Sequence, residues 1–210
     1  MDIARFKKLP IMGIWRGVED AALEPLLDTA ISAGLETVEI TMNTPQAAQL
    51  IKHAVRYCQR RLVVGAGTVL DMDSLKAALE AGATFIVMPV VITEVLTYCK
   101  KNKIPVFPGA FTPQEIYDAA RGGATMVKVF PAALGGPKYF KQLKGPFNDI
   151  ELMAVDGVRE DNIAEYFAAG ASAVAVGASV FDLLQISQGR FEHIRQRLAG
   201  LVAKVRAVLK

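Results

Sequence analysis

The feature that most constrains this chain is a regular alternation of short apolar runs with longer amphipathic runs. The short runs recur every roughly 20–25 residues, a period typical of repeated supersecondary units. Several of them are apolar throughout, which favours parallel strands covered on both faces. The eight predicted strands are Ile11–Arg16, Thr37–Thr41, Leu62–Ala66, Phe85–Met88, Pro105–Phe107, Met126–Val129, Glu151–Ala154 and Ala173–Val176.

Between these runs, apolar residues recur at the three-to-four spacing of helices that bury one face. The first such segment ends at Gly34, a residue that commonly terminates helices. The segment that begins at Thr112 opens with Thr-Pro-Gln-Glu, which predicts a capping box. Other predicted N-caps, all short polar side chains, are Asp71 or Asp73, Thr93 and Asp161.

Strict alternation of strand and helix predicts an α/β fold with a parallel sheet. Eight units predict that this sheet closes into a (β/α)8 TIM barrel, and an open doubly wound sheet is the alternative. A short N-terminal helix at Ile3–Lys8 and a C-terminal helix at Phe191–Leu209 are expected to flank the barrel. Because no linker or charge run interrupts the pattern, we expect residues 1–210 to form a single domain.

Composition narrows the classes of protein. The formal net charge is +3 and the basic residues are scattered, so no nucleic-acid partner is predicted. No apolar stretch reaches the ~18 residues of a membrane span, and no signal peptide is expected. Cys58 and Cys99 lie far apart, which fits a reduced cytoplasmic setting. His53 and His193 lie in helical patterns and are expected to be solvated, so no metal site is predicted.

Barrel enzymes carry their chemistry where the strands end at their C-terminal side. There, Lys128 interrupts an otherwise apolar run. Burial would lower the pKa of this lysine and give an amine that attacks ketones near neutral pH. The resulting iminium would act as an electron sink for carbon–carbon cleavage. The alternative is a lysine whose stem crosses apolar surface while its ammonium reaches water.

Glu39 likewise lies inside an apolar strand. A buried glutamate is costly unless it is paired or neutral. A raised pKa would suit it to carry protons during catalysis. The alternative is a structural ion pair with Arg16 or Lys128.

Three further segments at strand ends are candidates for substrate binding. Arg16 would offer a planar donor fork to a carboxylate or phosphate, or is a surface arginine. Thr68 would donate hydrogen bonds to a carboxylate, and the Gly-x-Gly before it lacks the rest of a nucleotide-binding motif. Gly157 and Gly177–Ser179 follow the last two strands, where barrels bind phosphate through backbone amides; tight-turn glycines are the alternative.

Taken together, several motifs resemble the family of 2-keto-3-deoxy-6-phosphogluconate aldolases and their 6-phosphogalactonate and 4-hydroxy-2-oxoglutarate relatives. The resemblance spans about Ile11 to Phe181. It implies a class I aldolase that forms a Schiff base, a homotrimer of barrels and no cofactor. The motifs are Ile14-Trp15-Arg16-Gly17, Val38-Glu39-Ile40-Thr41, Val64-Gly65-Ala66-Gly67-Thr68-Val69, Phe107-Pro108-Gly109 and Val127-Lys128-Val129-Phe130-Pro131-Ala132.

The resemblance also implies residue roles. Lys128 would form the Schiff base and Glu39 would be the general acid and base. Thr68 would contact the pyruvyl carboxylate, Arg16 would bind substrate, and the last two loops would hold a distal phosphate. The remaining predicted substrate-binding residues, all at strand ends or in the following loops, are Asn43, Pro89, Val155, Asp156, Gly157, Gly177, Ala178 and Ser179.

Two positions depart from the phosphogluconate pattern. Asn43 stands where an arginine is expected four residues after the glutamate, as in the phosphogalactonate branch. Asp156-Gly157 replaces a Gly-Gly pair, and an aspartate would repel a phosphate by several kcal/mol in a partly buried site. One explanation is that the substrate is unphosphorylated, either a sugar acid or 4-hydroxy-2-oxoglutarate. The other is that Asp156 points away from the substrate or accepts hydrogen bonds from its hydroxyls.

The sequence therefore predicts reversible cleavage of a 2-keto-3-deoxy (phospho)sugar acid or 4-hydroxy-2-oxoglutarate. The products would be pyruvate and an aldehyde, glyceraldehyde 3-phosphate or glyoxylate. Two alternatives remain at this stage, because a fold alone does not fix a function. One is another phosphate-binding barrel enzyme, an epimerase or synthase, and the other is a non-catalytic barrel that binds keto acids.

Overall fold

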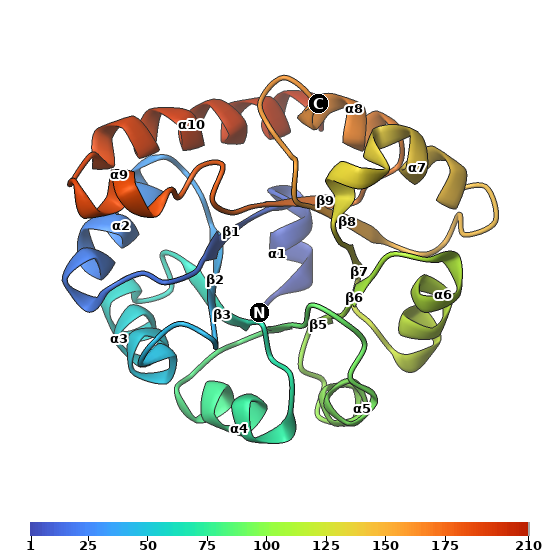
Figure 1. Ribbon diagram of the computed structural model, residues 1–210, viewed down its shortest axis with the longest axis horizontal. Helices are drawn as coiled ribbons and strands as arrows, with labels where there is room; N and C mark the ends of the chain where they lie inside the picture. The colour runs from blue at the N-terminus through green and yellow to red at the C-terminus, as the bar shows by residue number, and fades with distance from the viewer. Residues whose placement is uncertain (210) are drawn as a thin grey trace.

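The computed structural model describes residues 1–209 as a ring of parallel strands surrounded by helices (Figure 1). Every strand pair is parallel, and the order around the ring is β5-β4-β3-β2-β1-β9-β8-β7-β6. The strands are β1 (Ile11–Trp15), β2 (Thr37–Thr41), β3 (Val63–Gly67), β4 (Ile86–Val87), β5 (Val106–Phe107), β6 (Gly109–Ala110), β7 (Val127–Val129), β8 (Leu152–Val155) and β9 (Ala173–Val176).

The fifth predicted strand, Pro105–Phe107, contains β5, and the additional short strand β6 follows directly after Pro108, so the ring has nine strands where eight were predicted. Proline has no N–H to donate to a ladder, although the Pro108 carbonyl still accepts from the Lys128 N–H at 2.9 Å. β5 and β6 are consecutive in the chain yet stand at opposite ends of the strand order. The sheet therefore closes, which confirms the predicted barrel over an open doubly wound sheet.

Helices follow the strands and cover the outside of the ring. The first helix has its predicted bounds, and the last ends one residue earlier than predicted; the short helix at Leu183–Ser187 was not predicted. The helices are α1 (Ile3–Lys8), α2 (Asp20–Ser32), α3 (Ala47–Cys58), α4 (Met72–Glu80), α5 (Thr93–Lys101), α6 (Pro113–Gly122), the 3-10 helix η1 (Ala132–Leu134), α7 (Gly136–Leu143), α8 (Ile163–Ala168), α9 (Leu183–Ser187) and α10 (Phe191–Val208).

Two of the predicted caps are confirmed and two are wrong. Asp71 and Thr112 each form a capping box at the start of α4 and α6. Thr93 is the first residue of α5 rather than its cap, because the chain turns helical directly after Ile92. The N-cap of α8 is Asn162, the residue after Asp161.

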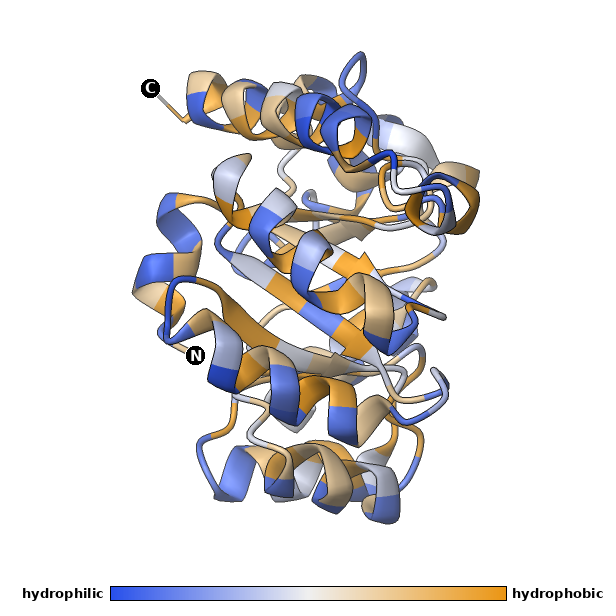
Figure 2. Cartoon of the chain, turned by 90° about the vertical axis from the view of Figure 1, so that its left-hand side faces the viewer, coloured by the Kyte–Doolittle hydropathy of each residue, from blue (hydrophilic) through white to orange (hydrophobic). Residues whose placement is uncertain are grey.

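The core has two parts. The larger packs the helices against the outside of the strands, and Figure 2 shows the apolar strands behind helices whose polar residues face outward. The smaller fills the barrel with Phe85, Phe107 and other large side chains. Phe6 of α1 joins this smaller cluster with its ring 6.0 Å from that of Phe107, so α1 closes one end of the barrel (Figure 1). Within residues 1–209, no helix combines the length and the apolar composition needed to cross a bilayer.

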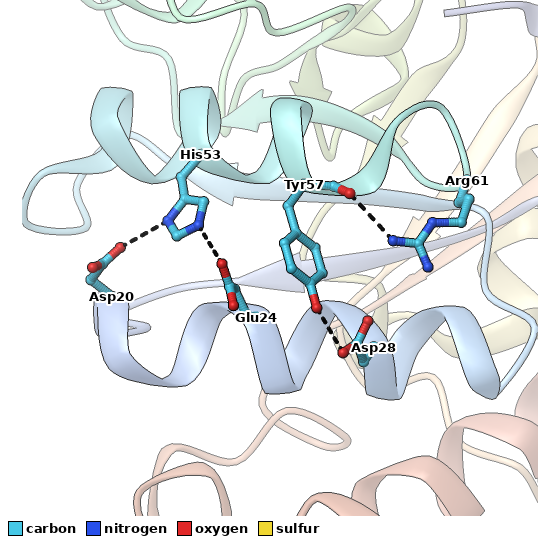
Figure 3. Close-up of polar contacts among 6 residues, drawn as sticks. All are labelled: Asp20, Glu24, Asp28, His53, Tyr57 and Arg61. Atoms are coloured by element: carbon cyan, nitrogen blue, oxygen red, sulfur yellow. Dashed lines mark hydrogen bonds and ion pairs between the residues drawn. The ribbon is translucent and has the colours of Figure 1, made fainter.

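Polar side chains join α2 and α3 on the outside of the barrel (Figure 3). His53 was expected to be solvated, but its two ring nitrogens lie 3.2 Å from Asp20 Oδ1 and 2.8 Å from Glu24 Oε1. Tyr57 donates to Asp28 one turn further along, at 2.8 Å. His53 nevertheless remains solvated as expected, with 38% of its side chain exposed, and the two carboxylates that α2 places beside it were not predicted.

Candidate active site

Lys128 lies in the middle of β7, between β6 and β8, with 6% of its surface exposed. Its Nζ lies 5.1 Å from the ring centre of Phe130, which directly follows the end of β7. Burial lowers the pKa of Lys128; the negative charge of Glu39 opposes this shift and the positive charge of Arg16 adds to it. The structure thus favours the neutral amine that the sequence predicted.

Glu39 lies in β2 and is 1% exposed. Burial raises its pKa, against the opposing effects of Lys128 and Arg16. Its Oε2 atom has no hydrogen-bond partner within the described chain, and no cation there lies within the 4.0 Å that would make an ion pair with it. Residues 1–209 therefore do not contain the structural ion pair that was the predicted alternative for Glu39. A buried carboxyl of this kind is suited to hold and release a proton.

Gly67 makes room for the Glu39 carboxyl. A Cβ atom at this position would lie 2.6 Å from Glu39 Cδ, a separation that real Cβ atoms do not adopt. From the sequence alone, Gly67 stood out only as the second glycine of a Gly-x-Gly. Its pairing with Thr41, two residues after Glu39 on the neighbouring strand, is the signal that could have revealed its role.

Thr44 ties the loop after Arg16 to the loop after Glu39. Its Oγ1 accepts from the Gly17 N–H at 2.9 Å and lies 3.1 Å from Thr41 Oγ1. The side chain is 4% exposed, so these hydrogen bonds are shielded from water. Thr44 therefore helps to place Arg16, a role that sequence reasoning missed.

A cavity of about 290 Å³ opens beside Lys128. Eight of the predicted site residues line it: Arg16, Lys128, Val155, Asp156, Gly157, Gly177, Ala178 and Ser179. The other four do not: Glu39 is buried, Asn43 is exposed after β2, and Thr68 and Pro89 are half-buried after β3 and β4. The loops after β8 and β9 and the end of β1 thus form the cavity together with Lys128.

The cavity has further lining residues that the sequence analysis did not select, among them Ile14, Phe130 and Leu183. Ile14 and Phe130 each stand two residues from a predicted site residue, Arg16 or Lys128, at the end of a strand, and residues two apart in extended chain share a face. That periodicity could have identified both. Leu183 lies on α9, the helix that was not predicted, so no signal placed it at the site.

The loop after β8 holds a rare backbone conformation. Asp156 and Gly157 have φ angles of 80° and 73°, in the left-handed region. Asn162 fixes this loop from within, because its Oδ1 accepts from the Arg159 N–H at 2.8 Å and its Nδ2 donates to the Gly157 carbonyl at 2.9 Å. Asp156 is exposed at the cavity wall.

A closed barrel with a buried lysine and a nearby buried carboxyl beside one cavity defines a lysine-based (β/α)8 enzyme. The model of the family described as "KDPG and KHG aldolase" matches residues 3–197, and the chain belongs to this family. The predicted family and the predicted class I aldolase activity are therefore confirmed at the level of the family.

Individual relatives agree with this membership. The 2-dehydro-3-deoxy-6-phosphogalactonate aldolase of Escherichia coli K12 is 33% identical over 97% of this chain and 98% of its own length. The 2-dehydro-3-deoxy-phosphogluconate aldolase of Pseudomonas aeruginosa is 37% identical over 76% of this chain and 71% of its own. A solved structure described as native KDPGal superposes with a TM-score of 0.90 at 32% identity, covering 96% of this chain and 97% of that one.

Proposed function

We propose that Lys128 of this aldolase forms the Schiff base with a 2-oxo acid and that Glu39 carries the protons of the reaction. One observation supports this most directly: a lysine almost excluded from water lines a cavity, close enough to a buried carboxyl for each to shift the pKa of the other. No other buried lysine is present among the described residues.

The proposed cycle begins with the neutral Nζ of Lys128 attacking the C2 carbonyl carbon of the substrate. Glu39 protonates the departing hydroxyl of the carbinolamine, so water leaves and an iminium forms. The Glu39 carboxylate then takes the proton of the C4 hydroxyl. The C3–C4 bond breaks, its electron pair moves onto the iminium nitrogen, and an aldehyde and an enamine result. Glu39 returns its proton to C3, and water releases pyruvate from Lys128.

Substrate binding is proposed for the same residues that the sequence selected. Arg16 would bind the carboxylate of the keto acid, since its charge acts on both Lys128 and Glu39. Thr68, Asn43 and Pro89 would complete the mouth of the barrel once substrate is bound. The distal part of the substrate would lie along the loops after β8 and β9, at Val155, Asp156, Gly157, Gly177, Ala178 and Ser179. The relatives' names support a 2-keto-3-deoxy sugar acid as the substrate class.

We further propose that residues 1–210 act as one aldolase domain, without a cofactor, in a cytoplasmic homotrimer. Self-association is supported by large apolar side chains that are exposed after β3, β4 and β7, namely Leu70, Val90 and Leu134. Buried, unpaired Cys58 and Cys99 suit a reducing compartment. Light scattering of the purified protein should give three times the mass of one chain; the mass of a monomer would contradict the trimer.

The function is tested by incubating the enzyme with phosphorylated and free 2-keto-3-deoxy acids and with 4-hydroxy-2-oxoglutarate, with pyruvate release as the readout. We expect release from at least one of them, and loss of release by at least about a thousandfold in Lys128→Met. Lys141→Met, at an exposed lysine of α7 that does not line the cavity, is the matched control. Full activity in Lys128→Met would rule the proposal out.

A further inference from the structure

The charges that line the cavity are unevenly distributed. Its lining contains the Arg16 guanidinium, the Lys128 amine whose pKa burial lowers, and a single carboxylate, Asp156. Arg16 acts on the pKa of both Lys128 and Glu39, whereas Asp156 affects neither. Lys128 pairs with Met153 on β8, and Asp156 follows three residues later, so Asp156 lies nearer the loop end of the cavity than the reacting amine does.

The backbone of Asp156 is fixed beside the cavity that its residue lines. A left-handed φ of 80° at Asp156 is followed by one of 73° at Gly157, and Asn162 makes two hydrogen bonds that hold the loop. Gly157 is itself closely packed, since a Cβ there would lie 2.6 Å from the Cβ of Ala133. The loop thus has little freedom to carry the backbone of Asp156 away from the cavity lining.

No cationic side chain neutralises Asp156 from the cavity lining at this end. The nearest arginine in sequence, Arg159, donates from Nε to Asp161 Oδ1 at 3.1 Å. Gly177 and Ser179 across the cavity bring only neutral donors. A phosphate ester, which carries about −1.5 to −2 charges, would meet a like charge here. A hydroxyl would instead donate a charge-assisted hydrogen bond to the carboxylate.

We propose that Asp156 determines specificity by selecting 2-keto-3-deoxy sugar acids whose far end carries free hydroxyls, and by disfavouring a phosphate ester at that end. The inference rests on the proposed aldolase function and deepens it. It also separates this chain from relatives whose names specify phosphorylated acids.

The test compares kcat/KM for a 2-keto-3-deoxyhexonate and for its 6-phosphate, measured with the same enzyme preparation. The ratio of the two values does not depend on the folded fraction. The wild type should prefer the free acid by at least about tenfold. Asp156→Asn keeps the shape and tolerates the left-handed backbone, and should lower this ratio about tenfold, chiefly through a lower KM for the phosphate ester. Asp156→Gly should act in the same direction.

Glu165→Gln is the matched control, because Glu165 is an exposed acid on α8 that does not line the cavity. It should leave the ratio within about twofold of wild type. A wild-type preference for the phosphate ester, or a ratio unchanged by both Asp156 substitutions, would overturn the inference while the aldolase function stood. If the wild type cleaved neither acid and did not exchange the methyl protons of pyruvate, both proposals would be wrong.

Discussion

Lys128 and Glu39 are both buried, and burial disfavours the charged form of each. Their mutual attraction opposes this effect, while the positive charge of Arg16 stabilises the anion and destabilises the ammonium. Burial thus has the largest effect on the pKa of the amine, and two neighbouring charges of opposite sign modify it. Removing either neighbour should change the reactivity of Lys128 in a direction that can be stated in advance.

Glu39→Gln and Arg16→Gln should shift the acid limb of the pH–rate profile for imine formation in opposite directions. Only the neutral amine attacks, so the limb follows the pKa of Lys128. Glu39 raises this pKa and Arg16 lowers it, so Glu39→Gln should move the limb to lower pH and Arg16→Gln to higher pH. The readout is the rate of borohydride inactivation at saturating pyruvate across pH. Arg206→Gln, at an exposed residue of α10, should not move the limb, and shifts of equal sign in the two test variants would refute this explanation.

Gly67→Ala should damage the site through Glu39. The added methyl group would lie 2.6 Å from Glu39 Cδ, so the glutamate must move within a packed barrel. We expect a loss of about 1–3 kcal/mol in unfolding free energy and at least a tenfold loss of turnover. Shortening the acid in the double variant Glu39→Asp/Gly67→Ala should recover much of the stability. A Gly67→Ala enzyme with wild-type stability and turnover would show that the glycine is not needed for this contact.

At the scale of elements, the pairing of α2 and α3 contains a pH-dependent contact. Hydrogen bonds to Glu24 and then to Asp20 raise the pKa of His53 above its ordinary 6.5 (Figure 3). The raised pKa stabilises the fold fully below 6.5, and this contribution disappears as the pH rises through the folded-state pKa. His53→Gln should therefore cost more at about pH 5.5 than at about pH 9, by at most about 1 kcal/mol after solvent screening. Denaturant unfolding at the two pH values measures the difference; an equal cost at both would disprove the role of the charge.

The elements were largely predictable, because strand and helix periods are properties of neighbouring residues. The alternation predicted the barrel, and local patterns predicted α1, a cap at Asp71 or Asp73 and the capping box of Thr112. The prediction was incomplete where the outcome depended on contacts distant in sequence. His53 is bound by carboxylates 29 and 33 residues away, and α9 lacks the length that would make its period visible.

The site was predictable in part for the same reason. Lys128 and Glu39 stood out as charged residues within apolar strands, and the structure places both in strands and buries them. Which of the predicted residues share one cavity was not predictable, since this depends on how the loops at the strand ends fold relative to one another. Thr68, Asn43 and Pro89 accordingly lie outside the lining, and Phe130 and Leu183 lie within it.

At the scale of the whole molecule, α1 closes the end of the barrel with Phe6, which is 3% exposed and packs on Phe107. Phe6→Ala should lower the unfolding free energy by about 3 kcal/mol, because it opens a cavity within the barrel. KM should be unchanged, since Phe6 does not line the cavity beside Lys128. Denaturant unfolding and steady-state kinetics measure the two effects. Lys8→Ala, at an exposed residue of the same helix, is the control, and equal stability of both variants would contradict the role of α1.

We propose that the barrel excludes water from the Lys128 amine, keeps it neutral and leaves it accessible to a keto acid. Adding pyruvate and borohydride and then mapping the peptides by mass spectrometry asks directly whether that amine reacts. We predict one reduced pyruvate adduct per chain, on Lys128 and absent from Lys128→Met. An unmodified Lys128, or an adduct carried by a different lysine, would contradict the proposed chemistry.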